Sequence, residues 1–198
     1  MEVADRTAGR PRDPHADTAI VEAVLDLVDA GATLSGLSLV AIAAHAGVSR
    51  NSVYRRWKTK DALYLDVLAS LNAPLPAPAG GTARNEVLAG LRLLVERTVN
   101  RRASSMLRAL NAEATAFPEL HRRYFDEIVA PRREAMYRAL RQGIAAGEIR
   151  SDVDVELVND VLVGMILSRM SSGAIDDLDP EDTGQRIVDI VFTGIQPR

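Results

Sequence analysis

The stretch from Leu39 to Trp57 constrains the fold of this chain more than any other part of the sequence. It opens with small and apolar residues, and Gly47 then predicts a helix end because glycine readily adopts the left-handed conformation. Ser49 follows as a candidate N-cap for a second short helix. Val53 and Trp57, four residues apart, are expected on the side of that helix that faces a core. The stretch therefore predicts two short helices joined by a tight turn.

The outward side of the second helix is basic and polar. Its expected outward residues are Arg50, Asn51, Ser52, Arg55 and Arg56. Two helices joined by a short glycine-containing turn, the second displaying such side chains, form the layout of a helix-turn-helix that reads DNA. The formal net charge of −3 argues against a nucleic-acid-binding protein, but residues 50–60 contain five basic residues and no acidic one. Because the distribution of charge matters more than its sum, the sequence predicts a DNA-binding surface.

The first fourteen residues lack periodic apolar positions and contain Gly9-Arg10-Pro11-Arg12. We interpret residues 1–14 as a flexible basic arm, in which Arg10 and Arg12 would enter a minor groove. A frayed terminus without a function is an equally good interpretation of this composition.

The rest of the chain has apolar residues at helical spacing, and no alternating strand pattern is found. Residues 72–81, with three prolines and two glycines, predict a loop between two helical regions. We expect the first helix to begin at Asp17 or Thr18, and Pro131 to kink or break a long later helix. The sequence thus predicts an all-α fold of about nine helices, with a DNA-binding domain at 15–71 and a second helical domain at 82–198. The later helices are expected at 86–102, 104–116, 117–146, 155–172 and 181–193.

The last two of these helices, from Val155 to Ser172 and from Glu181 to Thr193, are apolar on several faces. Such helices must be buried on several faces. One face can pack on the chain's own core, and a second copy of the chain is the simplest partner for the other. A central helix of a monomer is the alternative. We favour a homodimer formed through these two helices, because a helix-turn-helix protein usually needs two copies to bind a palindromic site.

Composition and spacing exclude several classes of protein. The chain has no cysteine, which excludes disulfides and thiolate metal sites. No apolar run is long enough to span a bilayer and no signal peptide is evident, so we expect a cytoplasmic protein without membrane contact. His15, His45 and His121 lie far apart, and no catalytic triad, metal-spaced cluster or phosphate loop is present. We therefore expect no catalytic residues, no metal and no cofactor, and a binding protein rather than an enzyme.

The first 70 residues resemble the TetR family of one-component bacterial repressors. Four segments at the family spacing carry the resemblance: Ser38 to Ala43, Ala46 to Ser49, Val53 to Trp57, and Lys60 to Leu63. Trp57 stands where phenylalanine is usual, and Arg56 stands where histidine or tyrosine is common. The resemblance implies a three-helix DNA-binding domain, a connecting fourth helix, and a helical C-terminal domain. In the family this second domain dimerises through its last two helices and holds an inducer in a cavity, so the resemblance implies the same here.

The resemblance also implies which residues contact operator DNA. Arg50, Asn51 and Ser52 open the recognition helix, where arginine can bond to guanine and asparagine to adenine. Tyr54 and Lys60 match positions that clamp phosphates, and Arg55 suits either a phosphate or a base. Ser38 and Ser49 are caps whose hydroxyls can also reach a phosphate. A packed aromatic side chain without a DNA contact is the alternative for Tyr54.

The inducer cavity is expected among residues of the central helices that mix apolar and polar character. The candidates are Met106, Leu110, Tyr124, Met136, Tyr137, Leu140, Met165 and Arg169. Simple core packing is the alternative for each of them. Arg102 and Glu113 are interpreted as a surface ion pair, with ligand contact as the alternative.

Taken together, these features predict a transcriptional repressor that a small-molecule inducer releases from its operator. The alternative is a DNA-binding regulator that senses no ligand and acts through a protein partner.

Overall fold

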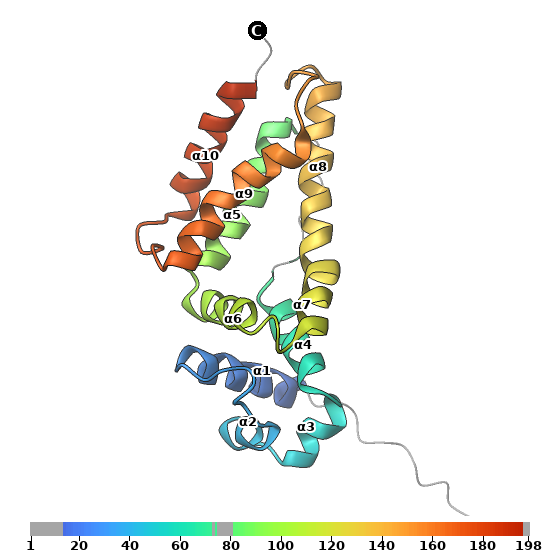
Figure 1. The fold of residues 1–198 in the computed structure, drawn as a ribbon, viewed down its shortest axis with the longest axis vertical. Helices are drawn as coiled ribbons and strands as arrows, with labels where there is room; N and C mark the ends of the chain where they lie inside the picture. Colours follow the sequence, from blue (N-terminus) through green and yellow to red (C-terminus); the bar gives the residue numbers. More distant parts are fainter. Residues whose placement is uncertain (1–13, 73, 75–80, 196–198) are drawn as a thin grey trace, which may run out of the picture.

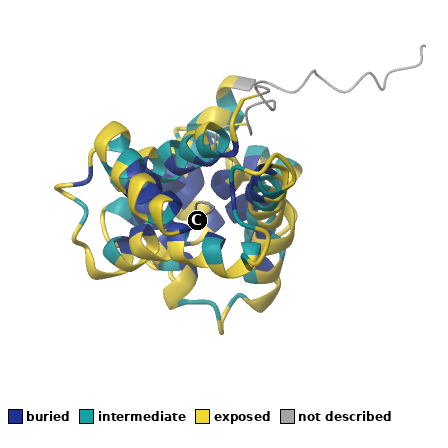
Figure 2. Ribbon diagram, turned by 90° about the horizontal axis from the view of Figure 1, so that it is seen from above, coloured by how far each residue is buried: buried dark blue, intermediate teal, exposed yellow. Residues whose placement is uncertain are grey.

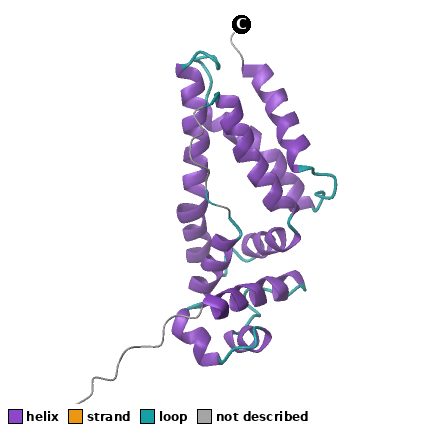
Figure 3. Cartoon of the chain, turned by 180° about the vertical axis from the view of Figure 1, so that it is seen from behind, coloured by secondary structure: helices purple, strands orange, loops and turns teal. Residues whose placement is uncertain are grey.

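The computed structural model describes residues 14–72, 74 and 81–195, and its described residues form helices without a strand (Figures 1 and 3). The expected all-α fold is confirmed. A π-helical segment joins α7 to α8, so the described part of the chain contains nine continuous helical rods. The elements are α1 (Pro14–Asp29), α2 (Leu39–His45), α3 (Arg50–Arg56), α4 (Lys60–Ser70), α5 (Ala83–Val99), α6 (Arg101–Ala112), α7 (Pro118–Tyr124), the π-helix (Phe125–Val129), α8 (Ala130–Ala145), α9 (Val155–Ser172) and α10 (Pro180–Ile195).

Helices α1 to α4 gather at one end of the molecule (Figure 1). Their apolar stripes meet in one cluster, in which Ile20, Ile42, Val53 and Leu63 are fully buried. The first helix begins at Pro14 and not at Asp17 or Thr18, because proline fits the first turn of a helix, where no backbone N–H partner is needed. The predicted arm at residues 1–14 lies outside the described residues except for Pro14, as do Arg10 and Arg12.

Helices α5, α8, α9 and α10 form the other end, with their buried residues turned toward one another (Figure 2). Gly143 allows the end of α8 to approach the start of α5 closely. A Cβ atom at this position would lie 2.5 Å from the Cβ of Ala83 and 2.8 Å from the Cδ1 of Ile149. The absence of a side chain at Gly143 therefore sets the spacing between these two helices.

Two helix boundaries differ from the expectation because side-chain caps define them. Thr82 accepts a hydrogen bond from the backbone N–H of Asn85 and starts α5, three residues earlier than expected. Asn100 ends α5 and accepts a hydrogen bond from the backbone N–H of Ala103, which starts α6 at once. The expected boundary near residues 102–104 is therefore at Asn100.

The expected distortion near Pro131 takes the form of the π-helical segment just before it. There the backbone N–H of Ala130 donates to the carbonyl of Phe125, a wider turn than the α-helical one. Pro131 has no backbone N–H, so it cannot donate the α-helical hydrogen bond to the carbonyl of Glu127. The helix continues through this segment into α8 and is not broken (Figure 1).

One side of α9 and α10 leaves large apolar side chains in contact with solvent. Leu162 and Ile166 of α9 are fully buried, whereas Leu157, Val161 and Ile190 are 63%, 55% and 75% exposed. We call the exposed set Leu157, Val161, Met165 and Ile190 the apolar face. Across the described ranges, no helix combines the length and apolar character needed to cross a membrane.

Candidate DNA-binding surface and ligand cavity

Helices α2 and α3 form the expected helix-turn-helix, and their ends are capped as the sequence predicts. Ser38 Oγ accepts a hydrogen bond from the backbone N–H of Ala41 at 3.1 Å and caps α2. Gly47, with a φ of +65°, makes the turn, where a residue with a Cβ would be strained. Ser49 Oγ accepts from the backbone N–H of Ser52 at 3.2 Å and caps α3. Buried Val53 and Trp57 then hold α3 on the core.

The outer surface of α3 presents the side chains that the sequence assigns to DNA. Arg50, Asn51, Tyr54 and Arg55 are exposed, and Ser52 is half-buried beside the hydroxyl of Ser49. The guanidinium of Arg50 lies 5.0 Å from the ring centre of Tyr54 and donates to its hydroxyl at 3.3 Å. The cation–π contact and the hydrogen bond hold the two side chains together on the outer surface of α3.

Arg56 differs from the expectation, because its side chain points inward. Its side chain is 5% exposed, and its guanidinium forms an ion pair with Asp17 of α1 and donates to the carbonyl of Ser52 at 3.0 Å. Trp57 similarly donates from its indole nitrogen to Asp66 of α4 at 2.7 Å. These two polar contacts fix the end of α3 to the neighbouring helices.

Lys60 also has a structural role that the sequence did not reveal. Its ammonium donates to the backbone carbonyls of Leu34, Ser35 and Leu37 at 2.8, 3.0 and 2.8 Å. An ammonium has three N–H groups, so all of them are used in this conformation. Lys60 therefore holds the loop before α2, and the predicted phosphate contact would require it to give up one of these bonds.

A cavity of about 830 Å³ lies between α5, α6, α8 and α9, a volume within the range of small-molecule sites. Its walls are mostly apolar, with Leu91, Leu94, Met136 and Val163 among the lining residues. Gly90 also lines it, and a Cβ there would lie 2.9 Å from the sulfur of Met136. The cavity thus has room for an organic molecule where α5 and α8 face each other.

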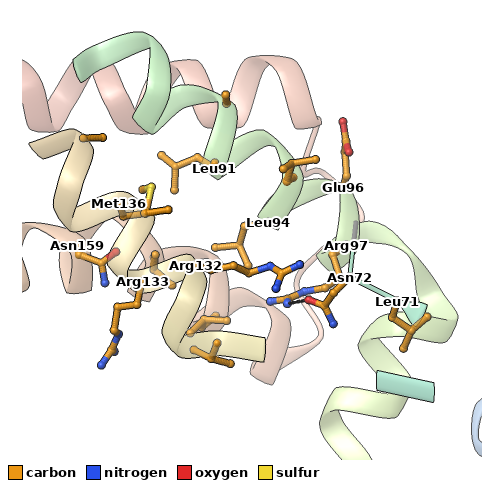
Figure 4. Close-up of a pocket in the computed structure, with 18 of the residues that line it drawn as sticks. Leu71, Asn72, Leu91, Leu94, Glu96, Arg97, Arg132, Arg133, Met136 and Asn159 are labelled. Atoms are coloured by element: carbon orange, nitrogen blue, oxygen red, sulfur yellow. Dashed lines mark hydrogen bonds between the residues drawn. The ribbon is translucent and has the colours of Figure 1, made fainter. Parts of the chain in front are cut away.

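Of the four arginines that line this cavity, Arg97 and Arg132 are half-buried, whereas Arg133 and Arg138 are exposed (Figure 4). Arg97 of α5 donates to Asn72 Oδ1 at 2.7 Å and bonds the hydroxyl of Tyr124. Arg132 of α8 donates to the carbonyl of Ile128 at 2.8 Å. Its pKa is lowered mainly by burial and to a smaller extent by repulsion from Arg97. Burial raises the pKa of Tyr124 despite both arginines, so its hydroxyl is neutral at physiological pH.

An amide of α9 contributes a further polar group to the cavity wall. Asn159 is 3% exposed, and its Oδ1 has no hydrogen-bond partner among the described residues. A buried polar atom without a partner is uncommon in proteins and calls for an explanation such as a ligand or a water.

The structure places two of the eight predicted cavity residues, Tyr124 and Met136, at the cavity wall. Met106, Leu110 and Leu140 are fully buried core residues instead. The others lie elsewhere: Tyr137 stacks with Arg141, Met165 is on the apolar face, and Arg169 pairs with Asp177.

The sequence interpretation missed Arg97, Arg132 and Asn159. One signal was available for Asn159. It occupies the same helical stripe as Leu162, Ile166 and Met170, so it is a polar residue on a buried face.

Helix α6 connects the cavity to the DNA-binding helices. Ala103 and Leu107 on one side of α6 line the cavity. On its other side, Arg102 pairs with Glu22 at 2.6 Å and Asp26 at 2.9 Å, both on α1. Arg101 and Ser105 likewise bond Asp29 of α1 at 3.1 and 3.0 Å.

Glu113, just after α6, binds the loop before α2. The ion pair with Arg102 that the sequence suggested is therefore not formed. Its carboxylate accepts from the backbone N–H groups of Leu34 at 2.6 Å and Ser35 at 2.9 Å, and from the Ser35 hydroxyl. Burial alone would raise the pKa of Glu113, but these hydrogen bonds hold it below its ordinary value. Hydrogen bonds therefore join the end of α6, a helix that lines the cavity, to the loop before α2.

Comparison with known proteins agrees with this architecture. Residues 34–67 match the model of bacterial regulatory proteins of the tetR family, and residues 77–191 match a tetracyclin repressor-like C-terminal domain. The HTH-type transcriptional regulator Rv1556 of Mycobacterium tuberculosis is 30% identical over 191 residues, covering 93% of this chain and 92% of the relative. The DNA-binding transcriptional repressor TetR of Mycobacteroides abscessus is 26% identical over 170 residues, covering 81% and 84%.

A solved structure shows the same fold. The transcriptional regulator FadR from Bacillus subtilis in complex with stearoyl-CoA superposes with a TM-score of 0.71, at 15% identity, over 90% of this chain and 99% of that one. The matched family models together cover most of the sequence and belong to transcriptional regulators, not to enzymes. The chain therefore belongs to the TetR family of DNA-binding transcriptional regulators.

Proposed function

We propose that this regulator is a repressor that binds operator DNA as a homodimer in the cytoplasm and leaves the DNA when a small molecule occupies the cavity. The observation that carries the proposal is the position of α6. One side of this helix lines the cavity, and the other side is tied by Arg101 and Arg102 to α1, on which α2 packs. A ligand that displaces α6 would therefore displace α1 and the DNA-binding helices with it.

The DNA contacts in this proposal come from the exposed side of α3. Arg50, Asn51 and Arg55 are exposed along α3 and Ser52 is half-buried in its first turn, and side chains of a recognition helix reach base edges. Tyr54, Ser38 and Ser49 would bond phosphates, which fixes register without reading sequence. Lys60 supports this surface by holding the loop before α2.

The homodimer in this proposal forms through the apolar face of α9 and α10. Leu157, Val161 and Ile190 are large, apolar and exposed, and an unpartnered patch of this kind marks an interaction site. A second copy, related by a two-fold axis, covers the same patch on both chains. The pair of α3 helices then reads the two halves of a palindromic operator.

Footprinting on DNA around the regulator's own gene, followed by calorimetry with a panel of metabolites, tests the proposal. We expect a protected palindromic site, and at least one compound that binds the protein and removes the protection. A compound that binds without releasing DNA would contradict the inducer mechanism and favour a regulator that acts through a protein partner.

The role of α6 is tested with Arg102→Gln, which removes the ion pairs to Glu22 and Asp26. We expect this variant to bind DNA and the inducer, and to need a higher inducer occupancy for release. Arg108→Gln is the matched control, because Arg108 is exposed on the same helix and donates to Ser105 within it. Equal release by both variants would show that the ion pairs do not transmit the signal.

A further inference from the structure

The cavity holds a positive charge that its described surroundings leave uncompensated. Arg97 is half-buried, and its contacts within the described residues are the amide of Asn72 and the hydroxyl of Tyr124, both neutral. Its Nε is buried without a hydrogen-bond partner. Removing a guanidinium from water without an opposing charge is costly. The described residues therefore leave the positive charge of Arg97 without a negative partner.

Neighbouring arginines show how the same chain treats this charge elsewhere. Arg92, Arg102 and Arg133 each lie within ion-pair distance of a carboxylate, at 2.6, 2.6 and 3.3 Å. Arg97 lies between Arg92 and Arg102 in the sequence, yet no ion pair to it is found among the described residues.

Two glutamates line the cavity, and neither compensates Arg97. Glu86 lies eleven residues earlier on α5, about 16 Å along the helix axis. Glu96 is exposed, and Figure 4 shows its carboxylate directed away from the guanidiniums of Arg97 and Arg132.

A second guanidinium, that of Arg132, adds positive charge beside Arg97. The side chains of Arg97 and Arg132 converge from α5 and α8 in Figure 4. The two guanidiniums are close enough that repulsion from Arg97 is the second cause, behind burial, of the lowered pKa of Arg132. Two converging guanidiniums attract an oxyanion more strongly than one, since each adds Coulomb attraction in a site partly shielded from water.

We propose that the cavity takes an organic monocarboxylate with an apolar body, whose carboxylate binds Arg97 next to Arg132. The unused Nε of Arg97, together with a terminal N–H, offers the parallel pair of donors that a carboxylate accepts in bidentate form. Leu91, Leu94 and Met136 would contact the apolar body. The inference rests on the proposed function only in taking this cavity as the inducer site.

Asn159 adds an independent sign that the cavity is built for a polar partner. Its buried Oδ1 lacks a hydrogen-bond partner, and in Figure 4 it lies on the other side of Arg132 from Arg97. A donor on the ligand, such as a hydroxyl at a distance from the carboxylate, would satisfy it.

Calorimetry on the full-length protein tests this with three matched pairs of probes: decanoate and 1-decanol, 2-naphthoate and 2-naphthalenemethanol, and 4-phenylbutanoate and 4-phenylbutanol. We expect the acid of at least one pair to bind about tenfold or more tightly than its alcohol, the gain typical of a hydrogen bond to a charged group. If every alcohol binds as well as its acid, or no acid binds, the proposal is wrong.

The variant Arg97→Gln should remove most of the acid's advantage over the alcohol and leave only the weaker attraction of Arg132, while the alcohol's affinity stays unchanged. Arg97→Lys, which keeps the charge but not the planar pair of donors, should retain part of the preference. Arg133→Gln is the matched control, since it removes the same charge from the cavity wall at a residue already paired with Asp160. An acid preference that is undiminished in Arg97→Gln, or is reduced equally in Arg133→Gln, would overturn the assignment to Arg97.

Release of operator DNA, measured in parallel, separates this inference from the proposed function. Acids that bind through Arg97 but leave the DNA complex intact would contradict the inducer mechanism and leave the ligand class supported. Release by neutral compounds alone would support the inducer mechanism and contradict the ligand class.

Discussion

Replacing Ile190 by alanine tests the proposed homodimer most directly. Its side chain is 75% exposed in the single chain, so a partner can still bury about three quarters of it. Full burial of an isoleucine side chain contributes about 1.5–3 kcal/mol, which leaves about 1–2 kcal/mol for the interface. Both chains carry the substitution, so the dimer loses about 2–4 kcal/mol, equal to a dissociation constant roughly 30- to 1,000-fold higher.

Sedimentation velocity over a dilution series measures this constant without DNA. We expect the wild-type chain to stay dimeric at concentrations where Ile190→Ala is monomeric, with the same helical circular dichroism for both. Val40→Ala is the matched control, since Val40 is 50% exposed but lies on α2 at the other end of the molecule. An unchanged dissociation constant in Ile190→Ala would show that α10 does not contribute to the interface.

Three further predictions concern DNA reading and stability. Asn51→Ala should alter preference at one or two base pairs by about 1–3 kcal/mol, whereas Tyr54→Ala should weaken binding to all operator variants alike; identical profiles in gel-shift titrations would refute this division. Glu113→Gln should lower the free energy of unfolding by about 1 kcal/mol, after allowing for its exposure. Because the folded state lowers the pKa of Glu113, this contribution is full above its ordinary pKa and disappears as the pH falls through the lowered value; a difference in urea denaturation that persists in acid would contradict the reasoning. Gly143→Ala should cost about 1–3 kcal/mol by forcing α8 away from Ala83, and an unchanged melting temperature would show that the helices adjust freely.

The helix-turn-helix was predictable because its determinants are local. Ser38 and Ser49 cap helices that begin one residue later, and Gly47 adopts the positive φ that its place in the turn requires. Arg50, Asn51 and Arg55 are exposed as the spacing of Val53 and Trp57 indicated. Contact of these residues with DNA stays a prediction.

The contacts that the sequence did not reveal join side chains to partners far away in the sequence. Arg56 turns inward because Asp17, 39 residues earlier, lies beside it, and Lys60 is held by carbonyls more than twenty residues away. Arg97 and Arg132 meet across two helices, so neither helix alone indicates a charged cavity. Single-helix periodicity also could not separate core methionines from cavity methionines: Met106 is fully buried, whereas Met136 reaches the cavity wall.

The short helix α3 divides its residues between two independent tasks. Val53, Arg56 and Trp57 hold it on the core, through burial and through bonds to α1 and α4. Arg50, Asn51 and Arg55 are exposed and take no part in that attachment. We therefore predict that substitutions at these three positions change which operator is recognised while the scaffold stays intact. Under the proposed function, new binding specificities become accessible one surface residue at a time, in evolution as in the design of synthetic gene circuits.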